Sequence, residues 1–141
     1  MIQKIKTRLA SDEGFTLIEL LVVIVILGIL VAIAVPAYLS FRGSAQTAAA
    51  ESNVRSAIPA AEGFYQTNTA NPNSYTGMTT PGLVAVAPGV DSTLTTVVST
   101  DGASYCLSAT NGTSTYHYVG GADAATVTDG GKVVTGACPT L

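Results

Sequence analysis

Glu19 is the residue whose type and position could do chemistry. It lies between the run Gly14-Phe15-Thr16-Leu17-Ile18 and the apolar segment Leu20–Val35, so it places one carboxylate in an otherwise apolar stretch of membrane-spanning length. A carboxylate that faces lipid near a bilayer centre is energetically costly, and an ionisable group in such a stretch usually has a partner or a function. We expect the same of Glu19.

A basic leader precedes this stretch. Residues 1–14 carry three basic residues followed by two acidic ones, and no Lys or Arg recurs before Arg42. Positive charge on the N-terminal side of an apolar helix predicts that the leader stays in the cytoplasm and that the C-terminus lies outside. The 22 residues 20–41 carry no formal charge, and at about 1.5 Å per residue they can span about 30 Å of hydrocarbon. The sequence therefore predicts one outward-facing membrane span.

Two simpler explanations of this segment stay open. A secretory signal peptide would be cut after a small-x-small pattern, and Ala32-Ile33-Ala34 before Val35 fits that rule. Glu19 inside the apolar region and the amphipathic continuation beyond Val35 argue against a discarded leader. An uncleaved membrane anchor is the second explanation, and it gives Gly14-Phe15 no role.

The helical pattern continues beyond Arg42. Glu51 and Arg55 have the i, i+4 spacing with the acid first, which stabilises an exposed helix face. Apolar and small residues recur at spacings of three and four and predict a buried stripe on one long helix, about residues 15–66. The stripe consists of Ala50, Val54, Ala57, Ile58, Ala61, Phe64 and Tyr65.

Three residues should interrupt this helix. Gly28 weakens it locally, because glycine has a poor helix propensity. Pro36 and Pro59 each remove a backbone donor, so we expect the helix to bend or break there.

The remainder predicts a small antiparallel sheet packed on the helix, an α+β fold. Residues 67–92 form a connecting loop with turn signals that include Thr80-Pro81-Gly82. Asn111-Gly112 and Asp129-Gly130-Gly131 predict hairpin turns. Five short segments rich in β-branched, aromatic or small residues are strand candidates: Leu94–Thr100, Ala103–Thr110, Thr115–Gly120, Ala124–Thr128 and Lys132–Thr135.

The two cysteines, Cys106 and Cys138, have 31 residues between them. In an exported domain such a pair predicts one disulfide, whereas in a reducing compartment it would be two free thiols. The membrane segment supplies the export context, so we expect the disulfide.

Composition and motifs offer no catalytic site. Charged residues make up 11% of the chain and the net charge is -3, which argues against nucleic-acid binding. His117 is the only histidine, so we interpret it as a strand residue and not as part of a triad or zinc site. Asp123 and Asp129 lie beside glycines without calcium-loop spacing, and Asn111-Gly112-Thr113 fits both a glycosylation sequon and a hairpin tip. We therefore expect no enzyme, no cofactor and no metal.

The run Gly14–Leu21, the apolar segment after it and the late cysteine pair resemble a type IV prepilin or a closely related pseudopilin. The resemblance covers about a third of the chain at the level of motifs and the remainder only in layout. It implies cleavage between Gly14 and Phe15 by a membrane prepilin peptidase, followed by N-methylation of the new Phe15 amine. One departure concerns the peptidase subtype, because Asp12-Glu13 stands where many relatives have Lys or Arg before the glycine.

The resemblance also implies how the product assembles. Glu19 would capture the Phe15 amine of a neighbouring subunit, and Gly28 to Pro36 would lose helicity in the fibre. The implied organisation is a leader (1–14), a membrane and fibre-core helix (15–41), an amphipathic helix (42–66), a connecting loop (67–92) and a sheet head (93–141).

The function implied is a structural subunit of a type IV pilus. Its partners would be further copies of itself, the prepilin peptidase, the pilus assembly platform and motor proteins, and the membrane before assembly. The precursor would lie in the bacterial inner membrane and the assembled pilus on the cell surface. Twitching motility, cell adhesion, DNA capture and surface sensing all fit such a fibre. The alternative is a pseudopilin of a type II secretion or DNA-uptake machine, and an anchored enzyme is a remote third.

Overall fold

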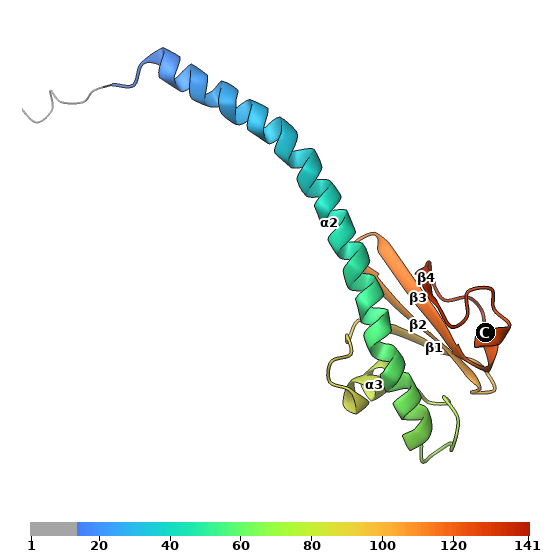
Figure 1. Cartoon of the computed structure of the whole chain (residues 1–141). Coiled ribbons are helices and arrows are strands. Elements are labelled where there is room, and N and C mark those ends of the chain that lie inside the picture. The colour runs from blue at the N-terminus through green and yellow to red at the C-terminus, as the bar shows by residue number, and fades with distance from the viewer. Residues whose placement is uncertain (1–13) are drawn as a thin grey trace, which may run out of the picture. The chain divides into compact units, whose positions relative to one another are not determined.

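The computed structural model describes residues 14–141, so all of the predicted leader (1–14) except Gly14 lies outside that range. The chain divides into two compact units, Met1–Ser40 and Phe41–Leu141. One helix, α2 (Leu17–Thr67), contributes to both units (Figure 1). We describe each unit by itself.

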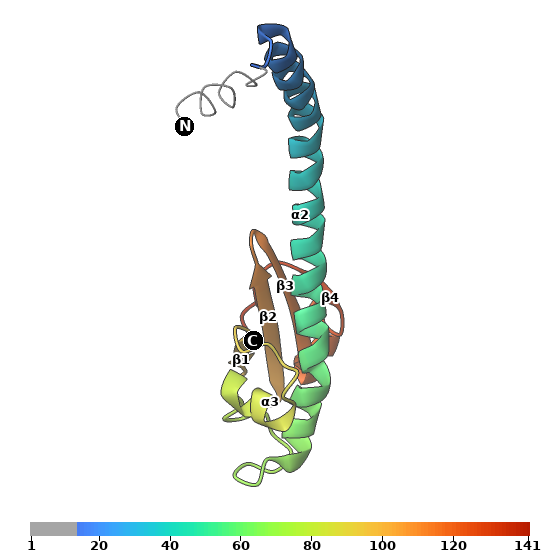
Figure 2. The same cartoon turned by 90° about the vertical axis from the view of Figure 1, so that its left-hand side faces the viewer.

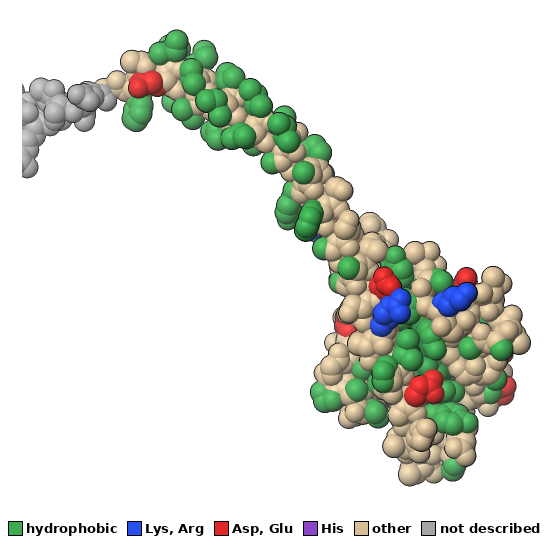
Figure 3. All heavy atoms as spheres, in the orientation of Figure 1, with side chains coloured by type: hydrophobic (Ala, Val, Ile, Leu, Met, Phe, Trp, Pro, Cys, Tyr) green, Lys and Arg blue, Asp and Glu red, His purple; other side chains and the backbone are tan. Residues whose placement is uncertain are grey.

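The first unit contains the apolar half of α2. Its most apolar 18-residue window has a mean hydropathy of 3.2 and is not buried at all in the chain, so by length and composition this helix can cross a membrane. Hydrophobic side chains cover its visible face (Figure 3). The helix continues through both Gly28 and Pro36, so neither residue breaks it in the single chain. The loss of helicity that we expect there in an assembled fibre stays a prediction.

The second unit contains the remainder of α2 and a four-stranded antiparallel sheet. The strands are β1 (Thr95–Val98), β2 (Ser104–Asn111), β3 (Ser114–Gly121) and β4 (Val133–Thr135), in the spatial order β1-β2-β3-β4. The α+β fold with a helix packed on a sheet is confirmed, and both ribbon views show α2 beside the sheet (Figure 2). Pro59 lies within α2 without ending it.

The core lies between α2 and one face of the sheet. Ala50, Val54, Ala57 and Ala61 of the predicted stripe are buried. Leu83 of the segment between α2 and the sheet also belongs to the core. Alternate residues of β2 line it, because successive side chains of a strand point to opposite faces. These residues are Tyr105, Leu107 and Ala109.

The opposite face of the sheet is covered by the C-terminal segment. Cys106 and Ser104 point to that face, and each is at most 1% exposed. Cys106 forms the predicted disulfide with Cys138, which follows β4. His117 Nδ1 donates a hydrogen bond to the Gly136 carbonyl at 3.1 Å. The last residues are therefore fixed to β2 and β3.

The predicted strand at Ala124–Thr128 is wrong. A 3-10 helix, η1 (Ala122–Ala125), and a series of turns occupy this region. The N–H groups of Thr126 and Val127 donate to the Asp123 carbonyl, and the Asp123 N–H donates to Ser104 Oγ. Local turns and a contact with β2 therefore take the backbone bonds that a strand would need. Asp129-Gly130-Gly131 accordingly lies in the turns that lead into β4 and joins no hairpin.

The predicted turn at Thr80-Pro81-Gly82 is also wrong, because a short helix, α3 (Thr80–Val86), begins there. Thr79 caps the helix by accepting a hydrogen bond from the Gly82 N–H, and proline is favoured in a first helical turn. The Asn111-Gly112 hairpin is confirmed. Gly112 supplies the positive φ of 61° in the two-residue loop between Asn111 and Ser114.

Candidate functional site

The candidate site is the start of α2. Residues 14–16 are not helical, and the helix begins at Leu17. The Thr16 N–H and the Thr16 hydroxyl both donate to Glu19 Oε2, at 2.9 and 2.8 Å. The Glu19 N–H donates back to Thr16 Oγ1 at 3.3 Å. This reciprocal pattern is a capping box, in which a side chain on each residue satisfies a backbone donor that the helix leaves unpaired.

Thr16 belongs to the candidate site through its hydrogen bonds to Glu19, and it was not predicted from the sequence. The spacing Thr16-x-x-Glu19 directly before an apolar run is the sequence signature of a capping box. The presence of Glu19 in the apolar run thus has a local reason as well as a proposed intermolecular one. Both hydrogen bonds from Thr16 end on Glu19 Oε2, and among residues 14–141 no donor contacts Oε1. Oε1 therefore has acceptor capacity for a donor from another molecule.

A substitution at Thr16 tests the capping box. Thr16→Val keeps the side-chain shape but removes the hydroxyl, and it should cost the helix start about 1 kcal/mol. Hydrogen exchange of the amides of residues 17–19, measured on the full chain in detergent micelles, should therefore become faster. Thr16→Ser is the matched control and should retain slow exchange. Equal rates for the Val and Ser variants would show that the hydroxyl does not stabilise the helix start.

The peptide bond between Gly14 and Phe15 is open to another protein. Both residues are exposed, with Phe15 at 88%, and both precede the helix. A Cβ built on Gly14 would meet nothing within 4 Å, and Gly14 has no positive φ. Neither space nor backbone conformation within residues 14–141 requires glycine at this position.

Gly28 is equally unexplained by the single chain. A Cβ at this position would also meet nothing within 4 Å. Glycine in an exposed helix interior costs about 1 kcal/mol relative to alanine. Gly28 is therefore a weak point in α2, and no close packing among the described residues compensates for it.

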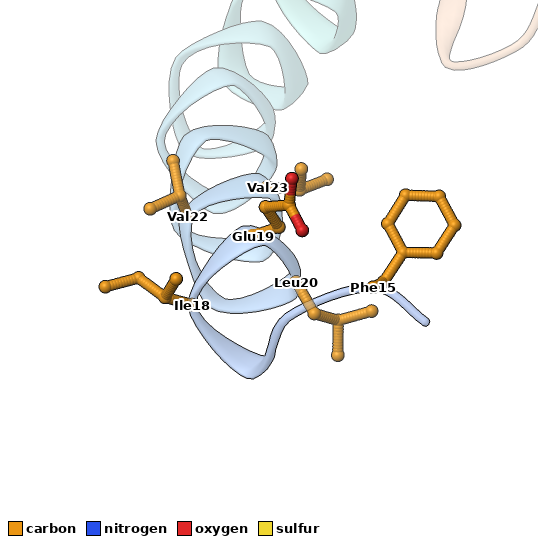
Figure 4. Close-up of a pocket in the computed structure, with 6 residues that line it drawn as sticks. All are labelled: Phe15, Ile18, Glu19, Leu20, Val22 and Val23. Carbon is orange, nitrogen blue, oxygen red and sulfur yellow. The ribbon is translucent and has the colours of Figure 1, made fainter. Parts of the chain in front are cut away.

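Apolar side chains surround Glu19. With Phe15, Ile18, Leu20, Val22 and Val23 it lines an open recess of about 590 Å³. Figure 4 shows the Glu19 carboxylate and the Phe15 ring on the same side of the helix start, with Ile18 and Val22 on the other side. A donor that reaches Glu19 here would bind among apolar groups, where a charge-assisted hydrogen bond is stronger than in water.

The other residues singled out in the sequence take part in the fold and not in the candidate site. Glu51 and Arg55 form the expected ion pair, with 2.7 Å between Glu51 Oε1 and Arg55 Nη2. His117 is buried in β3. Residues 14–141 contain no group of three His, Cys, Asp or Glu that could hold a metal ion. Gly112, in the sequon, has a positive φ of 61°, which favours glycine, and this accounts for the residue at the hairpin tip.

A hydrogen-bonded cluster in the second unit was not foreseen. Glu62 on α2 accepts hydrogen bonds from the hydroxyls of Tyr75 and Tyr105, at 3.0 and 2.7 Å. The rings of Tyr75 and Tyr105 pack with their centroids 4.5 Å apart. Burial, and then the hydrogen bond to Glu62, raises the pKa of both hydroxyls above the usual value for tyrosine. The cluster links the helix to the connecting loop and to β2.

The raised pKa of Tyr105 predicts a loss of stability at alkaline pH. Above about pH 10 the tyrosines of the unfolded chain release protons while Tyr105 in the folded chain keeps its own. Stability should be fully present below that pH and should fall as the pH rises, by about 1.4 kcal/mol per pH unit for each such tyrosine. Urea unfolding of wild type and Tyr105→Phe from pH 8 to 11 measures this. Identical slopes in the two proteins would contradict the prediction.

One family model matches the N-terminal part of the chain, and several known proteins are similar to stretches of it. Residues 9–35 match the family model described as the prokaryotic N-terminal methylation motif, and this range includes Gly14, Phe15 and Glu19. The chain is 39% identical over 54 residues to the type IV major pilin protein PilA of Myxococcus xanthus. This stretch covers 38% of this chain and 24% of that protein. No solved structure matches the chain.

Two further relatives match longer stretches of the chain. The chain is 36% identical over 78 residues to the type IV major fimbrial protein FimA of Dichelobacter nodosus, covering 55% of this chain and 50% of that protein. It is 38% identical over 68 residues to the type II secretion system core protein G of Pseudomonas aeruginosa, covering 48% of each. The matched segments thus span half or less of these three relatives. The predicted resemblance to type IV pilins and pseudopilins is confirmed.

Proposed function

We propose that this chain is the precursor of a structural subunit of an extracellular type IV pilus. A prepilin peptidase cuts it between Gly14 and Phe15, and the new amine is methylated. The observation that carries this proposal is the exposed Gly14-Phe15 bond directly before a capped Glu19 and an unburied apolar helix. All of these features lie within the matched methylation motif or continue from it.

Apolar packing provides the cohesion of the proposed fibre. The large apolar side chains from Phe15 to Val35 are 46% to 88% exposed in the single chain. Burying them against neighbouring helices would contribute roughly 25 cal/mol for each Å² of apolar surface removed from water. A head-to-tail contact of this kind does not close on itself, so repeating it produces an open filament.

Glu19 sets the register of the subunits. Cleavage creates a positive amine on Phe15, next to the Thr16 cap and within the apolar recess around Glu19. Glu19 Oε1 accepts the amine of a neighbouring subunit while Oε2 keeps its bonds to Thr16. A buried ion pair contributes little net stability but can specify one alignment. The pair therefore selects the stagger between subunits, and the apolar residues hold it.

The weak point at Gly28 fits the same assembly. Gly28 lowers the helix propensity of this segment and Pro36 lacks one backbone donor, so residues 28–36 can unwind at a lower cost than the rest of α2 when subunits pack. The unburied position of Gly28 supports this reading.

The second candidate is a pseudopilin of a type II secretion or DNA-uptake machine. The match to core protein G favours it. That match covers 48% of this chain and 48% of the relative, which is close to the 55% and 50% covered by the match to FimA. Both candidates share the N-terminal processing and the non-enzymatic role. Abundance and fibre length distinguish them, because a pilin forms long surface fibres in large amounts.

The proposed partners follow from the assembly. They are further copies of the chain, the prepilin peptidase, and the platform and motor proteins of the pilus. The precursor is stored in the bacterial inner membrane through residues 15–41, and the second unit faces outward.

N-terminal sequencing and mass spectrometry of sheared surface material test the proposal. The mature chain should begin at Phe15 and carry a methylated amine. Gly14→Leu should block cleavage, because a bulky side chain obstructs the peptidase cleft. Gly43→Leu is the matched control, since a Cβ at Gly43 also meets nothing within 4 Å. A mature chain that starts at Val35 would support the signal-peptide explanation and contradict the pilin proposal.

A further inference from the structure

The segment between Glu19 and Tyr38 is uniformly aliphatic. Residues 20–37 contain only Leu, Val, Ile, Ala, Gly and Pro, without a single polar or aromatic side chain. Glu19 and Tyr38 bound this segment, and both lie in the first unit and on α2. Tyr38 is 68% exposed. The segment therefore has a polar residue at each end and none between.

The length of this segment matches a bilayer. The 19-residue step from Glu19 to Tyr38 corresponds to about 28 Å along a helix at about 1.5 Å per residue. The hydrocarbon core of a membrane is about 30 Å thick. Tyrosine favours the boundary between lipid and water, where its ring contacts acyl chains and its hydroxyl reaches the headgroups.

We infer that Tyr38 marks the outer lipid–water boundary of the stored subunit, and that Glu19 consequently lies at the opposite boundary among phospholipid headgroups. The inference rests on the proposed storage of the precursor in a membrane. It assigns the phospholipid interface as the partner of Tyr38. The Glu19 carboxylate therefore does not lie in the hydrocarbon before assembly.

The alternative position of the helix is unfavourable. If Glu19 were at the bilayer centre, Tyr38 would lie about 13 Å beyond the hydrocarbon boundary, since half of the core is about 15 Å. About nine aliphatic residues would then be in water or among headgroups at about 1.5 Å per residue. Ile29, Leu30, Val31 and Ile33 are among them, and the chain itself leaves them 57% to 70% exposed. Placing Glu19 at the boundary keeps its carboxylate hydrated and these residues in lipid.

The capping box agrees with this position. The polar atoms of Thr16 and Glu19 lie together at the first turn, beside the non-helical residues 14 and 15. Non-helical backbone exposed to hydrocarbon is unfavourable, because its N–H and C=O groups find no partners there. At the boundary, water and headgroups supply those partners. The Gly14-Phe15 bond then lies outside the hydrocarbon, where an extended segment can enter a peptidase.

Fluorescence quenching by brominated lipids tests the inference. The chain contains no tryptophan, so three single-tryptophan variants of the full-length precursor can report depth: Leu20→Trp, Leu30→Trp and Tyr38→Trp. Each is reconstituted in phosphatidylcholine vesicles brominated either near the headgroup or near the acyl-chain end. The Leu20→Trp and Tyr38→Trp fluorescence should be lost mainly to shallow bromine, and the Leu30→Trp fluorescence mainly to deep bromine.

The outcomes separate this inference from the proposed function. Deep quenching of the Leu20→Trp variant, with Leu30→Trp also quenched, would overturn the position of Glu19 but leave membrane storage intact. No quenching of Leu30→Trp in either lipid would mean that the chain does not insert, which overturns both. Adding Tyr38→Leu to the Leu20→Trp variant should alter its ratio of shallow to deep quenching, whereas the neighbouring Leu39→Ile should not. An unaltered ratio would show that Tyr38 does not set the depth.

Discussion

Glu19→Gln precursor is expected to be cleaved between Gly14 and Phe15 but to be nearly absent from sheared surface fibres. Glutamine keeps a carbonyl acceptor at the third helical position, so it can retain the capping box with Thr16. It removes the charge that holds the Phe15 amine of a neighbouring subunit. The amine would then be buried without an opposite charge, and that penalty recurs at every subunit added to the fibre.

The design separates the two roles of Glu19. Glu19→Ala removes both the charge and the cap, Glu19→Gln removes only the charge, and Thr16→Val removes only the hydroxyl of the cap. If register depends on the ion pair, both Glu19 variants should lose fibres while Thr16→Val retains them in part. Glu51→Ala is the matched control, since Glu51 lies on the same helix and pairs only with the exposed Arg55.

The measurement compares mature subunit in the sheared fraction with mature subunit in whole cells. Because only cleaved subunit is counted in both fractions, a difference in cleavage between variants does not affect the ratio. Normal fibres from Glu19→Gln would refute the pairing role and leave Glu19 only as part of a helix cap. Loss of fibres from Glu51→Ala as well would indicate a general sensitivity to charge on α2.

The sequence predicted those parts of the fold that depend on local periodicity. The apolar run and the stripe from Ala50 to Tyr65 specify α2 and its buried face, because both repeat with the helical period. The β2–β3 hairpin followed from Asn111-Gly112, where one glycine supplies the positive φ that the turn needs. These features need no knowledge of distant residues.

The errors arose where distant residues decide the structure. Ala124–Thr128 had the composition of a strand, but the hydrogen bond from the Asp123 N–H to Ser104 Oγ, 19 residues away, fixes the start of this segment in η1. No local signal predicts that Tyr75 and Tyr105 both bind Glu62, or that Asn53 binds Asp91, because these partners are 13 to 43 residues apart. Asp91 also accepts hydrogen bonds from the Thr93 N–H and hydroxyl at 2.8 Å. The hydrogen bonds from Thr93, and to a smaller extent the one from Asn53, lower the pKa of the Asp91 carboxyl.

The candidate site shows both cases within a few residues. Gly14, Phe15 and Glu19 were predicted as site residues from their order in the sequence. Thr16 was not predicted although its spacing to Glu19 is a local signal, since Glu19 had been interpreted as a charge whose partner lies on another subunit. Its hydrogen bonds in the structure give that charge a role in the single chain as well.

Loss of the disulfide should cause the largest drop in stability of the second unit. The double variant Cys106→Ala/Cys138→Ala is expected to lower the free energy of unfolding by roughly 3 to 4 kcal/mol, since the bond closes a loop of this length in the unfolded chain. Alanine is preferable to serine at position 106, because Cys106 is fully buried in β2 and a hydroxyl there would add a polar-burial penalty. Thermal unfolding of the full chain in detergent, followed by circular dichroism, should show a melting temperature lower by at least about 10 °C.

The location of the bond predicts how this loss is distributed. Without it, the C-terminal segment is still fixed by β4, by the bond from His117 to the Gly136 carbonyl and by the bond from the Gly136 N–H to the Thr115 carbonyl. The native fold should therefore persist in the double variant, and hydrogen exchange should become faster throughout the sheet by a common factor. Single Cys106→Ala and Cys138→Ala variants are the controls and should match the double variant, because each abolishes the same bond. An unchanged melting temperature would show that the disulfide does not stabilise the protein, whereas faster exchange confined to β4 would indicate that it stabilises only the C-terminal segment.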